Sequence, residues 1–236
     1  MVTNVLTDPA FAALSSESKV WFYRQLGFQV GENVTVGQGS VIDATGLRID
    51  DDVQIGKDCL IKGTSVRLGR MVRIGDGCKI DTRECVLGDV TTLGDNVKIS
   101  GANKYGPKAG FWCGHTNMIS DECYIDTGEG VTFGDEVCLC NRVMVYTHNQ
   151  WQSVLDGYPA TFRPVKIGNN VHVEAGAIVA PNATIGDGNK IAANAVVSGK
   201  YQPRQRITAG GWFGFHVYSQ DNTIPLLSRQ SQIRIV

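Results

Sequence analysis

Residues 30–104 read, in groups of six, VGENVT VGQGSV IDATGL (30–47), IDDDVQ IGKDCL IKGTSV (49–66), LGRMVR IGDGCK IDTREC (68–85) and LGDVTT LGDNVK ISGANK (87–104). One residue separates each line of three groups from the next, so the phase returns after every 19 residues. The first position of all these groups is Val, Ile or Leu. Self-similarity at a hexapeptide period is typical of a β-helix, a solenoid of short stacked strands.

The fifth position of each group is also restricted. A large aliphatic residue followed by a small one predicts short strands whose first and fifth side chains point into a narrow core. Gly, Asp or Asn between them suits the corner turns. Three strands then form one triangular coil, the spare residue fits at a corner, and coils stack about 4.8 Å apart. The fifth positions are mostly small or β-branched (Val34, Ser40, Val53, Cys59, Ser65, Val72, Cys78, Thr91 and Val97), and Gly46, Glu84 and Asn103 complete the set.

The pattern resumes in residues 119–150 and 167–196, with groups such as ISDECY, FGDEVC, IGNNVH and IGDGNK. An apolar residue at every sixth position does not fit the 3.6-residue period of a helix. We therefore predict an all-β parallel β-helix of about eight coils.

The cysteines fit this scheme as small buried side chains. Cys59, Cys78 and Cys123 fall at fifth positions, and the same packing role is expected of Cys138 and Cys140. No pair has the Cys-x-x-Cys spacing of zinc sites, so no metal is expected.

Three regions fall outside the repeat. Residues 1–29 contain Asp8-Pro9 and apolar residues at helical spacing, which predicts a short helical cap on the open end of the first coil. The β-helix is expected over 30–199, with loops near 101–112 and 149–166. Residues 200–236 are expected to form a C-terminal extension. Loops expelled from a rigid scaffold are common places for binding groups.

Composition excludes several classes of function. The net charge of -1 gives no overall attraction to nucleic acid or anionic lipid. No apolar run approaches the roughly 18 residues of a membrane span. The first residues lack the basic flank and apolar stretch of a secretory signal, so the expected location is the cytoplasm.

His148 is the most promising of the four histidines. It follows Val145-Tyr-Thr, where one face of a coil ends and the aromatic-rich loop begins. A histidine with an ordinary pKa near 6.5 can take a proton from a hydroxyl at neutral pH. Trp151 and Tyr158, with Phe162, lie in the loop and are expected to bind substrate by stacking. Such aromatic side chains suit a sugar ring, but also a streptogramin-type drug or a lipid-linked glycan.

The segment from Phe133 to about Gly214 resembles the sugar O-acetyltransferases of the hexapeptide-repeat family, which includes galactoside, maltose and Nod-factor acetyltransferases. The matching runs are residues 134–148, 165–172 and 175–193, followed by Ala209-Gly210. The front half is similar to family members in capsule and lipopolysaccharide pathways. The resemblance implies a left-handed β-helix, a homotrimer, and acetyl-CoA lying between neighbouring subunits.

The resemblance also assigns roles to individual residues. His148 takes the place of the family's general base. Ala175 and Ala193, which are 18 residues apart, occupy positions where small side chains let acetyl-CoA approach, while Ser198 and Lys200 match polar and cationic contacts to the cofactor. The family's terminal Ala-Gly-x-Pro-Ala is here Ala-Gly-Gly-Trp-Phe, so the arginines that follow it are absent.

No clear match exists for the family's asparagine on the coil before the histidine. Asp126 and Glu129 stack at about that place, and either could orient the imidazole, while Asp126 is also expected among the substrate-binding residues and could simply serve a corner turn.

The expected function is acetyl transfer from acetyl-CoA to a sugar hydroxyl in cell-surface polysaccharide biosynthesis, by direct transfer without a covalent enzyme intermediate. N-acetyl transfer to a nucleotide amino sugar and a non-catalytic binding or structural β-helix stay open as alternatives. A γ-class carbonic anhydrase needs a histidine pair that this chain lacks. Serine acetyltransferase has a long N-terminal helical domain, for which only some 29 residues are available here.

Overall fold

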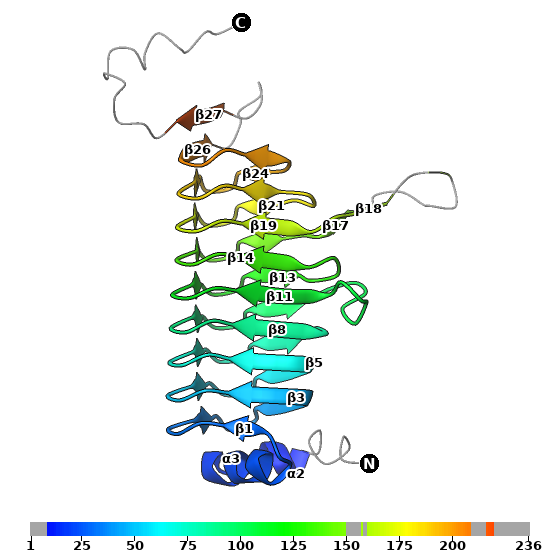
Figure 1. Ribbon diagram of the computed structural model, residues 1–236, viewed down its shortest axis with the longest axis vertical. Coiled ribbons are helices and arrows are strands. Elements are labelled where there is room, and N and C mark those ends of the chain that lie inside the picture. The colour runs from blue at the N-terminus through cyan, green and yellow to red at the C-terminus, as the bar shows by residue number, and fades with distance from the viewer. Residues whose placement is uncertain (1–8, 150–156, 158–159, 209–215, 220–236) are drawn as a thin grey trace, which may run out of the picture.

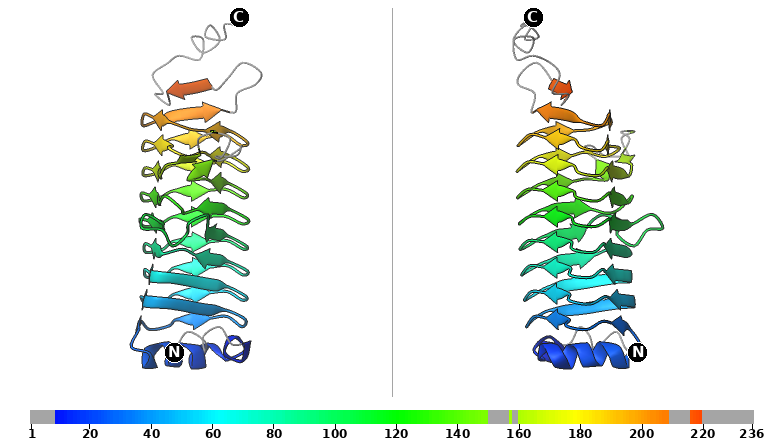
Figure 2. Two further views of the ribbon diagram at one scale, coloured as in Figure 1. Left: turned by 90° about the vertical axis from the view of Figure 1, so that its right-hand side faces the viewer. Right: turned by 60° about the vertical axis from the view of Figure 1, so that its left-hand side comes forward.

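The chain folds into a column of stacked coils (Figures 1 and 2). The computed structural model describes residues 9–149, 157, 160–208 and 216–219. Parallel strands pair from coil to coil over about 9 turns, and the hexapeptide repeat fits the left-handed form. The predicted parallel β-helix is therefore confirmed, with one turn more than expected.

Two long sheets form the walls of the column. The register confirms the 19-residue period, since Val36 pairs with Ile55, Ile55 with Ile74 and Ile74 with Leu93. The 10-stranded sheet contains β2 (Thr35–Val36), β4 (Gln54–Ile55), β6 (Arg73–Ile74), β9 (Thr92–Leu93), β12 (Met118–Ile119), β15 (Cys138–Leu139), β20 (His172–Val173), β23 (Lys190–Ile191), β26 (Gln205–Thr208) and β27 (His216–Ser219).

The 15-stranded sheet supplies the other walls, because β3 and β5 each run through a corner without a break. It contains β1 (Gln29–Val30), β3 (Val41–Ile49), β5 (Leu60–Leu68), β7 (Lys79–Asp81), β8 (Glu84–Leu87), β10 (Lys98–Ser100), β11 (Gly110–Cys113), β13 (Tyr124–Asp126), β14 (Val131–Phe133), β16 (Met144–Val145), β19 (Val165–Ile167), β21 (Ile178–Val179), β22 (Thr184–Ile185), β24 (Val196–Val197) and β25 (Lys200–Tyr201).

The core is the stack of aliphatic first positions. All of them from Val36 to Ile99 are buried, while Val30 is partly buried against the cap. The fifth positions behave as predicted in the first two groups of each coil but not in the third. Gly46 is exposed and Ser65 half-buried, because the side chains of a continuous strand alternate and place Leu47 and Val66 inside instead.

The two ends of the column are finished differently. Helices α2 (Pro9–Ala12) and α3 (Ser16–Gln25) lie across the first coil, where the buried hydroxyl of Tyr23 accepts from the Ile42 N–H. At the other end β25 and β26 continue the parallel stacking beyond residue 199, and β27 pairs antiparallel with β26. Neither described helix is long or apolar enough to cross a bilayer.

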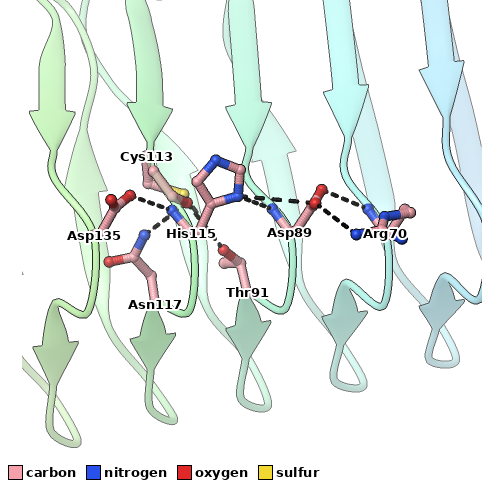
Figure 3. Close-up of polar contacts among 8 residues, drawn as sticks. Arg70, Asp89, Thr91, Cys113, His115, Asn117 and Asp135 are labelled. Carbon is pink, nitrogen blue, oxygen red and sulfur yellow. Dashed lines mark hydrogen bonds and ion pairs between the residues drawn. The ribbon is translucent and has the colours of Figure 1, made fainter.

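Side chains at the corners link successive coils. At one corner an acidic or amide side chain accepts a hydrogen bond from a backbone N–H of the preceding coil, as Asp135 does from His115 at 2.7 Å. Figure 3 shows that His115 takes the acceptor role itself, because its Nδ1 receives the Asp89 N–H at 3.1 Å. Other links in this ladder join Glu32 to Asp51, Arg70 to Asp89, Asp135 to Asn169 and Asn169 to Asp187.

The seven cysteines are free thiols. Cys59 and Cys78 are buried as predicted, and each donates its S–H to a glycine carbonyl of the next coil. Cys123 is buried in the same way. Cys138 and Cys140 are only half-buried, so the packing role expected of them does not hold. Each lies at an outward position on either side of buried Leu139.

Candidate active site

His148 lies where the chain leaves the column. It follows the buried Thr147 and opens β17 (His148–Asn149), which pairs antiparallel with β18 (Thr161–Phe162) at the base of the long loop. In Figure 1 this two-stranded stem projects from the side of the column. The His148 side chain is 29% exposed, so it is held by the scaffold but accessible from outside.

Asp126 lies one coil back and binds the imidazole directly. His148 Nδ1 and Asp126 Oδ2 are 2.5 Å apart. The same oxygen accepts from the Thr147 N–H at 2.9 Å and from the Thr147 hydroxyl at 2.8 Å, while Oδ1 accepts from the Gly128 N–H at 3.2 Å. The carboxylate is fully buried and fixed by four hydrogen bonds, so it leaves His148 little freedom to rotate.

This contact determines which nitrogen of His148 can act as a base. A carboxylate only accepts hydrogen bonds, so Nδ1 carries the proton and Nε2 has the lone pair. No described residue forms a hydrogen bond with Nε2. The ring of Phe162 stacks on the imidazole with centroids 6.0 Å apart and planes 16° from parallel. The arrangement is a histidine–aspartate pair with its basic nitrogen available to a substrate.

Glu129, the other carboxylate considered for orienting His148, is bound elsewhere. Its side chain pairs with Lys108 at 3.2 Å, and its backbone N–H donates to the Thr147 hydroxyl. Asp126, which was expected among the substrate-binding residues, has no exposed surface and contacts His148 instead. Both carboxylates were predicted to lie near the histidine. The direction of their side chains at the corner makes Asp126, and not Glu129, the partner of the imidazole.

The segment between β10 and β11 lies beside the same corner. It is anchored by Asp81, whose carboxylate accepts from the Lys104 ammonium and from the Tyr105 hydroxyl at 2.9 Å. Burial would raise the pKa of Asp81, but these hydrogen bonds outweigh it and hold that pKa below its usual range. Through Lys108 and Glu129 the segment reaches the coil that carries Asp126. The segment between β10 and β11 is therefore anchored along one side of the candidate site.

The residues expected to bind the cofactor fall at two corners. Ala175 and Ala193 are exposed on successive coils, joined by the hydrogen bond from the Asn194 N–H to the Ala175 carbonyl. Ser198 and Lys200 are exposed at the next corner, which is also the corner of His148. The strand pairing β16–β21–β24 places Ser198 two coils beyond it. Within one chain the four residues do not form a single group.

Trp151 and Tyr158, the expected stacking residues, lie outside the described residues. Phe162 is described, and its partly exposed ring contacts His148 as noted above. Of the other histidines, His115 is part of the corner ladder and His172 lies beside Cys140. The contact between Thr147 and Asp126 was not predicted, although both residues lie at the same corner on successive coils.

Comparison with known protein families identifies the repeat. Residues 164–199 match the family described as bacterial transferase hexapeptide (six repeats). These residues include β19 to β24, the coils that follow His148 in the column. The hexapeptide-repeat resemblance seen in the sequence is thereby confirmed. A search of the curated proteins finds no match.

Several solved structures are similar to this chain at low identity. A maltose O-acetyltransferase from Clostridium difficile 630 is 23% identical over 64% of this chain and 67% of its own, with a TM-score of 0.40. A variant of AntD, an N-acyltransferase from Bacillus cereus in complex with dTDP and coenzyme A, is 18% identical over 92% and 96%, with a TM-score of 0.44. A hexapeptide-repeat acetyltransferase from Vibrio cholerae is 15% identical over 91% and 87%, with a TM-score of 0.39.

Proposed function

We propose that the protein is an acyltransferase that moves an acetyl group from acetyl-CoA to a hydroxyl of a sugar, with His148 as the general base. The observation that carries the proposal is the 2.5 Å contact between His148 Nδ1 and the buried carboxylate of Asp126. Such a contact fixes the tautomer and supports the positive charge that develops on the ring during proton transfer. The match to the bacterial transferase hexapeptide family is consistent with this chemistry.

The proposed reaction is a single displacement at the thioester carbon. Nε2 takes the proton of the acceptor hydroxyl while that oxygen attacks the carbonyl. The tetrahedral intermediate collapses with cleavage of the carbon–sulfur bond, and the proton passes from His148 to the departing thiolate. Backbone N–H groups near the loop stem would hold the oxyanion. No step requires a nucleophilic serine or cysteine.

Acetyl-CoA would reach His148 along the corner that carries Ser198 and Lys200. These exposed side chains lie about 10 Å farther along the column, two coil spacings from the imidazole. An ammonium group there suits the phosphates of the nucleotide, and the small Ala175 and Ala193 would serve a second surface of the ligand. Because the two pairs lie at different corners, the proposal includes a homotrimer whose neighbouring chain brings them to one cleft.

Thiol release from acetyl-CoA by the purified protein tests the proposal. The acceptor panel should contain sugars, nucleotide amino sugars and hydroxylated antibiotics, so that it also separates O-transfer from N-transfer. His148→Ala should lower kcat at least about a hundredfold, the usual contribution of a general base. His115→Asn is the matched control, because Asn169 already serves the same ladder two coils later. Turnover that survives in His148→Ala would overturn the proposal.

A further inference from the structure

Three side chains with soft or borderline donor atoms converge on the wall formed by β15 and β20, away from the His148 corner. Cys138 and His172 are directly paired in register on these parallel strands. Cys140 follows two residues after Cys138 and so projects from the same face. The donor atoms of the three residues all lie within 4.8 Å of one another. From these contacts we infer a binding site for a thiophilic metal ion such as Zn²⁺, independent of the proposed acyltransferase function.

The distances suit a tetrahedral ion. Zinc binds thiolate sulfur at about 2.3 Å and imidazole nitrogen at about 2.0 Å, which separates two ligands of one ion by roughly 3.5 Å. Cys140 Sγ and His172 Nε2 are 3.6 Å apart. Small side-chain rotations are enough to close the triangle, since every pair already lies within 4.8 Å. On binding, each thiol releases its proton to solvent and coordinates as a thiolate.

The scaffold presents these ligands in a defined arrangement. Their backbones belong to paired strands and to the corner directly after one of them, where the Cys140 N–H donates to the Val173 carbonyl at 2.9 Å. All three side chains are half-buried, so an ion can reach them from solvent. Met118, which is exposed, pairs with Cys138 on the preceding coil and adds a soft thioether beside the site. Soft sulfur donors favour ions such as Zn²⁺ and Cu⁺ over Mg²⁺ or Ca²⁺.

The fourth coordination position is left to solvent or to an external ligand. Glu174, one coil beyond Cys140, is already engaged, since its carboxylate pairs with Lys190 at 3.2 Å and accepts from the Ala193 N–H at 3.0 Å. Three protein ligands with an open position are typical of zinc sites that bind a further molecule.

The test is metal binding by the full-length, reduced protein, measured with Zn²⁺ in competition with a chromogenic chelator and with Co²⁺ by its thiolate charge-transfer absorption. One Zn²⁺ per chain and a near-ultraviolet cobalt band are expected. Cys138→Ser, Cys140→Ser and His172→Gln should each weaken binding at least tenfold. Cys140→Ser is a conservative change, because Ser120 occupies the equivalent position one coil earlier.

Cys78→Ser and His115→Asn are the controls, since they remove a thiol and an imidazole elsewhere. Ser40 makes the same carbonyl contact one coil before Cys59, so serine is compatible with the position of Cys78. Circular dichroism of each variant checks that the fold is retained. The site is disproved if the reduced protein binds no stoichiometric Zn²⁺, or if folded Cys138→Ser and Cys140→Ser proteins bind it as tightly as the parent. Either result leaves acetyl transfer unaffected, so the two proposals fail separately.

Discussion

Asp126 is the residue on which the geometry of the site depends. It is fully buried, and its Oδ2 atom accepts hydrogen bonds from the Thr147 N–H, the Thr147 hydroxyl and the His148 ring N–H. Burying a carboxylate is costly unless it is paired and hydrogen-bonded, so this cluster is stable only when it is complete. In the proposed reaction Asp126 would act through His148, as a positioning residue.

Asp126→Asn should separate that role from a purely structural one. The amide keeps the size of the side chain, but it has one acceptor oxygen in place of two, and the imidazole loses its negatively charged partner. We expect kcat to fall about 10²- to 10⁴-fold while KM for acetyl-CoA changes little. The double variant with His148→Ala should be no slower than His148→Ala alone, because the two residues act as a unit. Additive losses would show that Asp126 acts elsewhere.

Part of the site could be predicted from single residues. His148 could be found because it lies where one face of a coil ends and because its surroundings resemble a family motif. The choice between Asp126 and Glu129 depended on side-chain directions at a corner, which periodicity does not determine. The Cys138, Cys140 and His172 cluster is also predictable from the repeat. Cys138 and His172 are the sixth residues of their groups, and Cys140 is the second residue of the next group. All three positions adjoin an aliphatic first residue that points inward, so their side chains face outward.

At the scale of elements, one buried carboxylate anchors the segment between β10 and β11 to the column, beside the Lys108–Glu129 ion pair and the hydrogen bond from the Arg83 N–H to the Lys104 carbonyl. Asp81 is 5% exposed and receives hydrogen bonds from Lys104 and Tyr105. Its pKa is lowered in the folded state, so its contribution to stability is present above the unfolded value near 3.8 and is lost as the pH falls through the lower folded value. The contribution is therefore complete at neutral pH.

Asp81→Asn should loosen this segment without unfolding the column. Amide hydrogen exchange at Arg83, whose N–H donates to the Lys104 carbonyl, and at Gly106, whose N–H donates to the Asn103 carbonyl, is expected to rise at least tenfold at pH 7, while β10 and β11 stay protected. In the parent protein the same exchange, corrected for its intrinsic pH dependence, should increase only below about pH 4, where the carboxylate becomes protonated. Lys57→Ala, which changes an exposed cation far from this segment, is the control. Unchanged protection in Asp81→Asn would mean that other contacts hold the segment.

The elements of the column were predictable because each coil repeats the same local code. The prediction was wrong in detail at Gly46 and Ser65, because two strands pass through a corner and alternation, rather than the six-residue period, decides which side chain is buried. The long loop was predicted from the break in the repeat. Its stem, β17 with β18, could not be predicted, because residues 148–149 and 161–162 carry no strong strand signal.

At the scale of the molecule, the column contains one continuous stack of aliphatic side chains from the cap to the last coil. Each coil contacts mainly its two neighbours, so stability is nearly a sum of coil and interface contributions. Damage to one coil should therefore lower the stability of the column without altering a site several coils away.

Ile61→Ala tests this independence. Ile61 is fully buried between Ile42 and Ile80 of the adjoining coils, and the cavity should cost about 2–5 kcal/mol of unfolding free energy. Denaturant unfolding measures the loss, and Met71→Ala, at an exposed side chain, should change stability by less than about 0.5 kcal/mol. The kcat of folded Ile61→Ala should equal that of the parent. A lower kcat would show that packing strain reaches His148 along the column.

The corner ladder gives the column a direction. In each link the backbone N–H belongs to the earlier coil and the accepting side chain to the later one, from Glu32 and Asp51 through Asn169 and Asp187. During synthesis from the N-terminus, a newly emerged corner therefore has an unpaired donor until its successor has been translated. Each coil is completed by the next one, so assembly on the ribosome is expected to proceed in order, and the last coil of a stalled chain is left with its ladder donor unpaired.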